Sequence, residues 1–376
     1  MKNFSFDIEL IIQCCQYNTN TDKIQSLISK ITDWETFINL AFTHGVFPLV
    51  YKELKQHSSL IPQEVLNIMK SHNMDIIKEN MLMSAELIKV MKLLEENNIE
   101  ALAFKGPTLA QMAYGDITLR QYGDLDILVN KDDIYKVYDL LKGSYSRELK
   151  CTPSQEKTWF KYAHDLGLTA KNGTHIEFHW RMLDTDHPIN LKDIDFFKNK
   201  TFIDLKKQSI PVISNEEFLI YLCVHGSKHM FERIEWVVDI DKFIRTQYID
   251  WNKIDNLIQN KNYQLFVFLG LHLSNYLFST EIKLKSNYIN SNIQQVKSHI
   301  FDLWQNNNEF NNKNSTLYML KLFSSIIDKI NYIFKIYLKP TFTEYRYINL
   351  PKSLHILYYP LRQYLLIKKY FLNKNK

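Results

Sequence analysis

The chain has 376 residues, of which 45% are hydrophobic and 23% are charged, and its formal net charge is +5. These values are ordinary for a globular protein and exclude a mostly disordered chain. The length predicts two packed units, or one core with helical additions.

The sequence contains no pattern typical of a membrane span or of export. A run of about 18 uncharged apolar residues, which a transmembrane helix needs, occurs nowhere in it. The N-terminus has Asp7 and Glu9 where a signal peptide would have its apolar stretch. The four cysteines lack CxxC spacing, and two of them are adjacent, which suits neither a zinc site nor a disulfide framework. We therefore expect a reduced, cytoplasmic protein.

The first part of the chain is predicted to be helical. Within residues 62–97, apolar side chains recur at the spacing of one helical face. Residues 34–55 predict a further helix and its continuation. We assign residues 1–97 to an N-terminal helical region.

The middle of the chain changes to a strand pattern. Six of the nine glycines lie between residues 106 and 173, so tight turns are concentrated there. Asn172-Gly173 predicts a tight turn between two strands, and residues 131–142 predict a helix between two others. Four short apolar or alternating segments predict the strands themselves: 99–104, 124–129, 165–170 and 174–180. Residues 98–214 are therefore expected to form a small mixed sheet with helices against it, and the fold class is α+β.

After residue 215 the sequence predicts helices and no further strand, with a helical domain at 215–334 and an Asn-rich loop at 306–315. Residues 335–376 contain nine Lys and Arg but a single acid, so this segment carries +8 and the rest of the chain −3. Its aromatic residues alternate with the basic ones, which favours packing on the helical region. Base stacking, or a membrane-surface helix at 354–372, are the alternatives.

A pair of acids marks the candidate active site. Asp124 and Asp126 are two residues apart on a predicted strand, so their carboxylates project from the same face. Two adjacent like charges are costly unless a cation lies between them, and Mg²⁺ is the usual cation. Glu177 lies on another predicted strand and shares a face with His175 and His179. If the two strands are neighbours, three carboxylates converge in a site able to hold two metal ions.

The residues before these acids are suited to binding phosphate. A predicted strand-to-helix turn begins with Lys105 and Gly106 and continues to Thr108. Backbone N–H groups and the positive end of a helix attract anions at such a turn. Lys105 adds one cation and Arg120 a second. Phosphoryl transfer depends mainly on positioning and charge neutralisation, and these residues are of the kind that supplies both.

The segments FKGPTLAQMAYGDITLRQYGDLDILV and HIEFHWRML resemble the nucleotidyltransferase superfamily of the DNA polymerase β type. They are most similar to a bacterial branch described as uncharacterised nucleotidyltransferases, and residues 224–243 and 339–366 also look like that branch. The resemblance implies that Asp124 and Asp126 are the metal-binding pair and that Glu177 is the third carboxylate.

One motif departs from the family pattern. The family has Gly-Ser at the start of the helix after the first strand, whereas this chain has Gly106-Pro107-Thr108 preceded by Lys105. The usual serine–phosphate contact therefore does not carry over. The Lys-Gly version is also similar to toxin nucleotidyltransferases of abortive-infection systems.

Three further residues are candidates for substrate contact. His225 and Lys228 lie on one predicted helix, and Lys228 could reach a triphosphate from it, with a solvated lysine as the alternative. A zinc site of His225 and His229 is the alternative, but the acid of a zincin arrangement is missing. His179 is a candidate near the acceptor, and a packed, partly buried ring is its alternative. The second Asp-x-Asp motif, at 239–241, lies on a predicted helix, where the two side chains diverge, so it is not interpreted as a metal pair.

These observations predict an enzyme that transfers NMP from an NTP to an acceptor hydroxyl or phosphate and releases pyrophosphate. The expected cofactor is Mg²⁺, with Mn²⁺ as a substitute. The acceptor is a small molecule, a peptide, a sugar or RNA. One alternative is a toxin-like enzyme that modifies tRNA, which the basic C-terminal segment would favour. The other is a catalytically idle nucleotide-binding or scaffold protein, against which the three acids argue.

Overall fold

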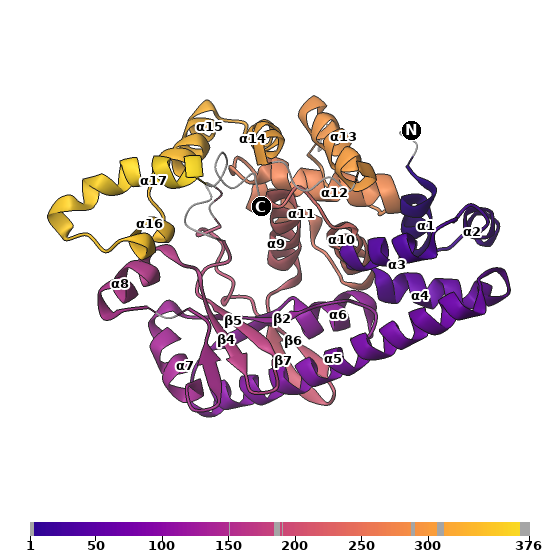
Figure 1. Ribbon diagram of the computed structural model, residues 1–376, viewed down its shortest axis with the longest axis horizontal. Coiled ribbons are helices and arrows are strands. Elements are labelled where there is room, and N and C mark those ends of the chain that lie inside the picture. The colour runs from indigo at the N-terminus through magenta and orange to yellow at the C-terminus, as the bar shows by residue number, and fades with distance from the viewer. Residues whose placement is uncertain are drawn as a thin grey trace.

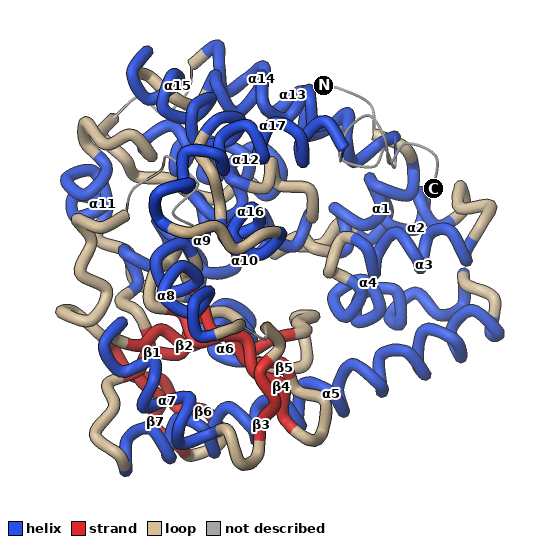
Figure 2. The backbone as a smooth tube through the Cα atoms, turned by 60° about the vertical axis from the view of Figure 1, so that its left-hand side comes forward, coloured by secondary structure: helices blue, strands red, loops and turns tan. Residues whose placement is uncertain are grey.

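The computed structural model describes residues 4–149, 151–183, 189, 191–286, 290–306 and 312–368. These residues form a seven-stranded mixed sheet with helical regions before and after it in the chain. The α+β fold class is therefore confirmed. Figure 2 shows the strands gathered at one end of the molecule, with most of the helices stacked above them.

The N-terminal region is helical, as predicted. Its elements are α1 (Phe6–Cys14), α2 (Thr21–Ile28), α3 (Trp34–Thr43), α4 (Phe47–Leu54), η1 (Lys55–Leu60) and α5 (Gln63–Glu96). The helix predicted at 34–55 is divided in two because Gly45 has a φ of +72°, and Pro48 then starts the new helix. The long helix α5 runs alongside the sheet and contacts β1, β2 and β7 (Figure 1).

The sheet contains the four predicted strands and three that the sequence did not reveal. The strands are β1 (Ala101–Phe104), β2 (Asp124–Val129), β3 (Tyr145–Arg147), β4 (Asp165–Ala170), β5 (His175–His179), β6 (Thr201–Leu205) and β7 (Gln208–Val212). Their order is β3-β4-β5-β2-β1-β7-β6. The missed strands are short or largely exposed, and β7 contains Pro211, so none has a clear apolar alternation.

The connections within the sheet region follow local signals. The Asn172-Gly173 turn joins antiparallel β4 and β5, with Gly173 at a φ of +89° and the Asn172 side chain accepting a hydrogen bond from the Thr174 N–H. The helical elements of the sheet region are α6 (Gly106–Tyr114), η2 (Lys131–Asp133), α7 (Ile134–Leu141) and α8 (Pro153–Tyr162). The predicted helix at 131–142 is confirmed as η2 and α7. Helix α8 was not predicted, although Thr152 and Gln155 form a capping box at its start.

The second helical region begins at Asn215. Its elements are α9 (Asn215–Lys228), α10 (Ile234–Thr246), α11 (Trp251–Ile258), α12 (Gln264–Phe278), α13 (Ser291–Asn306), α14 (Asn312–Lys321), α15 (Ile326–Ile333), η3 (Phe334–Leu338), α16 (Phe342–Tyr347), η4 (Lys352–Leu357) and α17 (Tyr358–Ile367). The predicted Asn-rich loop is wrong for residues 312–315, which start α14, and residues 307–311 lie outside the described part. No helix within the described ranges has the length and apolarity needed to cross a bilayer.

The C-terminal segment lies beside α8 of the sheet region, at the left of Figure 1. The Tyr345 ring of α16 lies 5.4 Å from the Tyr162 ring of α8. Arg362 pairs with the buried Glu344 at 3.2 Å, so one cation of this basic segment is used internally. The predicted base-stacking and membrane-surface roles extend past residue 368, outside the described part, and stay predictions.

His44 makes the stability of the fold depend on pH. It is 4% exposed, and its Nδ1 accepts a hydrogen bond from the Ile234 N–H of α10. Burial and the nearby Arg233 lower its pKa from 6.5 to about 4. Because the folded state favours the neutral ring, this stabilisation is complete above pH 6.5 and is lost as the pH falls towards 4. Below pH 4 the loss is expected to reach roughly 3 kcal/mol.

Urea unfolding of the protein between pH 7.5 and 4 would measure this loss. The His44→Gln variant should show a flatter dependence of the free energy of unfolding on pH, because Gln does not titrate. The matched control is His72→Gln, at an exposed position, which should keep the wild-type dependence. Equal slopes for wild type and His44→Gln would contradict the assignment.

Candidate active site

The register of two parallel strands brings the predicted carboxylates together. Strand β2 pairs with β5, and Asp126 lies opposite Glu177. Cα partners on neighbouring strands project to the same face of the sheet. Asp124 precedes Asp126 on that face by two residues, and His179 follows Glu177 by two. The sheet therefore gathers three acids and a histidine on one side.

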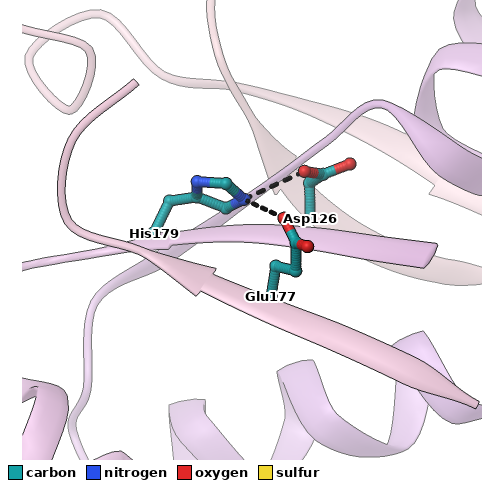
Figure 3. Close-up of side chains that lie close together, drawn as sticks. All are labelled: Asp126, Glu177 and His179. Atoms are coloured by element: carbon teal, nitrogen blue, oxygen red, sulfur yellow. Dashed lines mark hydrogen bonds and ion pairs between the residues drawn. The ribbon is translucent and has the colours of Figure 1, made fainter. Parts of the chain in front are cut away.

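His179 bridges two of the acids (Figure 3). Its Nε2 lies 3.0 Å from Asp126 Oδ1 and 3.2 Å from Glu177 Oε2. Burial disfavours the charged ring, but the hydrogen bonds to Asp126 and Glu177 outweigh it and raise the pKa of His179 to about 9. At neutral pH the imidazole is thus a cation that holds both carboxylates.

Lys105 supplies a second cation to the same carboxylate. Its Nζ lies 3.5 Å from Asp126 Oδ1 and 5.6 Å from the centre of the Tyr221 ring of α9. Its backbone has a φ of 58° and a ψ of −156°, a conformation that is strained for any residue but glycine. Such strain costs about 1–3 kcal/mol and is typical of functional sites. The fold thus accepts strain where it positions Lys105.

The turn after Lys105 lies directly against the acidic strand. Gly106 has a φ of +45°, and a Cβ atom on it would come within 3.2 Å of the Asp124 carbonyl oxygen. Only glycine therefore fits without displacement. The buried Thr108 hydroxyl donates a hydrogen bond to the Lys105 carbonyl at 2.8 Å, so it holds the turn together. The N-terminus of α6, where the first N–H groups have no acceptor within the helix, is thereby fixed beside β2.

The two aspartates differ in their electrostatics. Burial and the neighbouring Asp126 raise the pKa of Asp124, although Lys105 opposes them. Burial would also raise the pKa of Asp126, but Lys105 and His179 outweigh it and lower that pKa. The charge of Asp126 is thus balanced by neighbouring cationic side chains, whereas the fold disfavours the charged form of Asp124.

Asp126, Glu177 and His179 form a group that fits a metal ion. Each offers one ligand atom, and the three atoms lie within 4.8 Å of one another. Asp126 Oδ2 is buried and has no hydrogen-bond partner among the described residues. Carboxylate oxygens suit Mg²⁺ and Mn²⁺, whereas an imidazole nitrogen suits metals such as Zn²⁺ and Fe²⁺. To act as a ligand, His179 would have to release its proton.

Arg120 is paired with an acid outside the converging group. It is 6% exposed, and its Nε and Nη2 donate to the Asp239 carboxylate of α10 at 3.0 Å each. Glu235 lies 3.9 Å from the same guanidinium. The predicted phosphate-binding cation is thus engaged in a buried ion pair that joins the loop before β2 to α10. Asp241 pairs separately with Arg245 at 2.7 Å, so the side chains of 239–241 diverge as expected.

His225 of α9 lies near Lys105, and its ring is part of a group of aromatic side chains. Its ring centre lies 5.0 Å from that of His229 and 5.4 Å from that of Trp236. Burial, followed by the charge of Lys105, lowers the pKa of His225 well below its usual value. Lys228 is half-buried in the last turn of the same helix.

Two residues of the site were missed at the level of sequence. Tyr221 lies one turn before His225 on α9, and its ring packs edge-on against Phe104 at 5.5 Å; the four-residue spacing was a usable signal. The His164 ring lies 5.5 Å from that of His179. No local pattern indicates His164, because it reaches the site through pairing of the strands.

We compared the sequence and the structure of the chain with those of known proteins. Residues 30–279 match the sequence model of a family described as "Uncharacterised nucleotidyltransferase". Among solved structures, the chain is similar to an antigenic nucleotidyltransferase-like protein from Paracoccidioides brasiliensis. That similarity has a TM-score of 0.36 and 13% identity, over 54% of this chain and 94% of the other. No curated protein matches the chain significantly.

Proposed function

The chain belongs to the uncharacterised nucleotidyltransferase family, and on that premise we propose that it transfers NMP from an NTP to an acceptor hydroxyl or phosphate, with Mg²⁺ as cofactor. The observation that carries the proposal is the register of β2 and β5, which sets Glu177 opposite Asp126. Family membership accounts for a nucleotide substrate. The converging acids account for the cation that its phosphates need.

Each residue has a role that follows from its position. Asp126 and Glu177, together with Asp124, would hold Mg²⁺, and His179 would orient both carboxylates of the facing pair. Bound Mg²⁺ would neutralise phosphate charge and lower the pKa of the attacking hydroxyl. Lys105 and the N-terminus of α6 would hold the triphosphate.

The reaction balances without a further reactant. The acceptor oxygen forms a bond to the α-phosphorus, and the bond from that phosphorus to the bridging oxygen of pyrophosphate breaks. The proton of an acceptor hydroxyl passes to solvent water beside Glu177, whose side chain is 39% exposed. A phosphate acceptor needs no proton transfer. The same convergence of acids argues against an idle scaffold, which would gain nothing from their mutual repulsion.

Calorimetry with each of the four NTPs, with and without Mg²⁺, tests the proposal. Binding should require Mg²⁺, and Lys105→Ala should weaken it about 10–100-fold, the effect of losing a charged hydrogen bond. Lys136→Ala is the matched control, because Lys136 is exposed on α7 and its ion pair is with Asp133. Folded protein that binds no NTP, or that binds it equally well in EDTA, would overturn the proposal.

A further inference from the structure

A large cavity adjoins the acidic site. It measures about 1160 Å³ and opens beyond the ends of β2 and β5, where Leu128 and Trp180 line it. Leu128 lies opposite His179 in the sheet. The cavity therefore begins two residues along the strands, or about 7 Å, beyond the facing Asp126 and Glu177. Its other walls come from the loop after β5, from α15, and from the start of the C-terminal segment at Lys335 and Lys339.

The charge of the cavity lining is strongly positive. Two acids line it, Asp195 and Asp328. Against them stand five cationic side chains: Lys161, Arg181, Lys192, Lys335 and Lys339. A lining with such an excess of cations raises the local concentration of anions.

Three of these cations gather around Tyr162. The Nζ atoms of Lys161 and Lys339 lie 5.3 Å and 5.8 Å from the centre of its ring. Arg181 donates through Nη1 to the carbonyls of Lys161 and Ala163, at 3.2 Å each. Within the described residues, none of the three cations forms an ion pair with a carboxylate. Cations without a carboxylate partner are available to an anionic ligand.

The remaining wall is apolar. Trp180, Met182 and Phe196 contribute to it, and Phe197 lies beside them. A concave site with apolar walls and a few charged groups is typical of small-molecule binding, and its volume is that of a site for a molecule of cofactor size. A surface that follows an RNA backbone would instead be an extended basic groove.

We propose that this cavity binds the acceptor, and that the acceptor is a small phosphate ester with an apolar or aromatic body. Its phosphate contacts Lys161, Arg181 and Lys339, and its body lies against Trp180. The reacting oxygen then extends along β5 towards Glu177. This inference rests on the proposed function for its reaction, but the cavity's ligand can be tested separately.

The test uses 1-naphthyl phosphate as a probe of this chemistry, with calorimetry on the full chain. The probe should bind, whereas 1-naphthol and inorganic phosphate should each bind at least about 10-fold more weakly. The first lacks the phosphate that the cations would bind, and the second lacks the aromatic body that the apolar wall would contact. The double variant Lys161→Gln/Lys339→Gln should weaken probe binding about 10-fold or more. The matched control, Lys131→Gln/Lys136→Gln, has its changes in η2 and α7 and should bind like wild type.

Binding of Mg²⁺ and NTP is measured on the same variants. The cavity variant should keep it, which separates a failure of the acceptor site from a failure of the nucleotide site. Absence of probe binding, or binding that the cavity variant retains in full, would overturn the proposal. If a single-stranded RNA oligomer binds more tightly than the probe and displaces it, the acceptor is RNA and the proposal of a small acceptor is overturned.

Discussion

Asp124→Asn is expected to lower NMP transfer by about 10³-fold or more and, at the same time, to raise the thermal stability of the metal-free protein. The loss of activity follows from removing one carboxylate of the cation site. The gain in stability follows from burial and from the neighbouring Asp126, which both raise the pKa of Asp124. The folded state therefore disfavours the charged form of Asp124, and Asn removes that cost.

Turnover of labelled NTP with Mg²⁺ and thermal unfolding in EDTA measure the two effects on one sample. Asp139→Asn is the matched control, since Asp139 is exposed on α7 and should change neither quantity. Full transfer activity in Asp124→Asn would contradict the assignment of Asp124 to the cation site. A marked fall in its unfolding temperature would show that Asp124 holds the fold together instead of straining it.

Arg120→Met is expected to destabilise the protein by about 3–5 kcal/mol, the cost of leaving buried charges without their partner. Asp239 would lose a two-pronged ion pair, and Glu235 would lose its nearby cation. Glu235 already has a pKa raised to about 7 by burial, which Arg120 opposes. The double variant Arg120→Met/Asp239→Leu should recover most of the loss, because apolar side chains of similar size can replace a buried pair.

Urea unfolding of the single and double variants at pH 7 measures these free energies. NTP binding by the folded double variant then decides between the two roles of Arg120. Wild-type affinity is expected, because the guanidinium is committed to α10. An affinity at least tenfold weaker would mean that Arg120 contacts the triphosphate, as its place in the sequence suggests.

Several secondary-structure elements of this protein can be predicted from short stretches of sequence. The four central strands, helix α5 and the β4–β5 turn follow from apolar spacing and from Asn172-Gly173. The common face of Asp124 and Asp126 follows from strand periodicity alone. The edge strand β6 and its neighbour β7 escaped prediction because largely exposed strands need no apolar alternation.

Tertiary structure decided which residues meet. The sequence predicts phosphate binding by Arg120, and the structure adds a partner, Asp239, that lies 119 residues away and that no local pattern couples to it. His179 bridges two acids because β2 and β5 are neighbours in one register. Lys161 and Lys339 approach the same tyrosine because α8 and the C-terminal segment pack together. A local pattern fixes the face on which a side chain lies, whereas its partner is set by long-range packing, and the chemistry of a charged group depends on that partner.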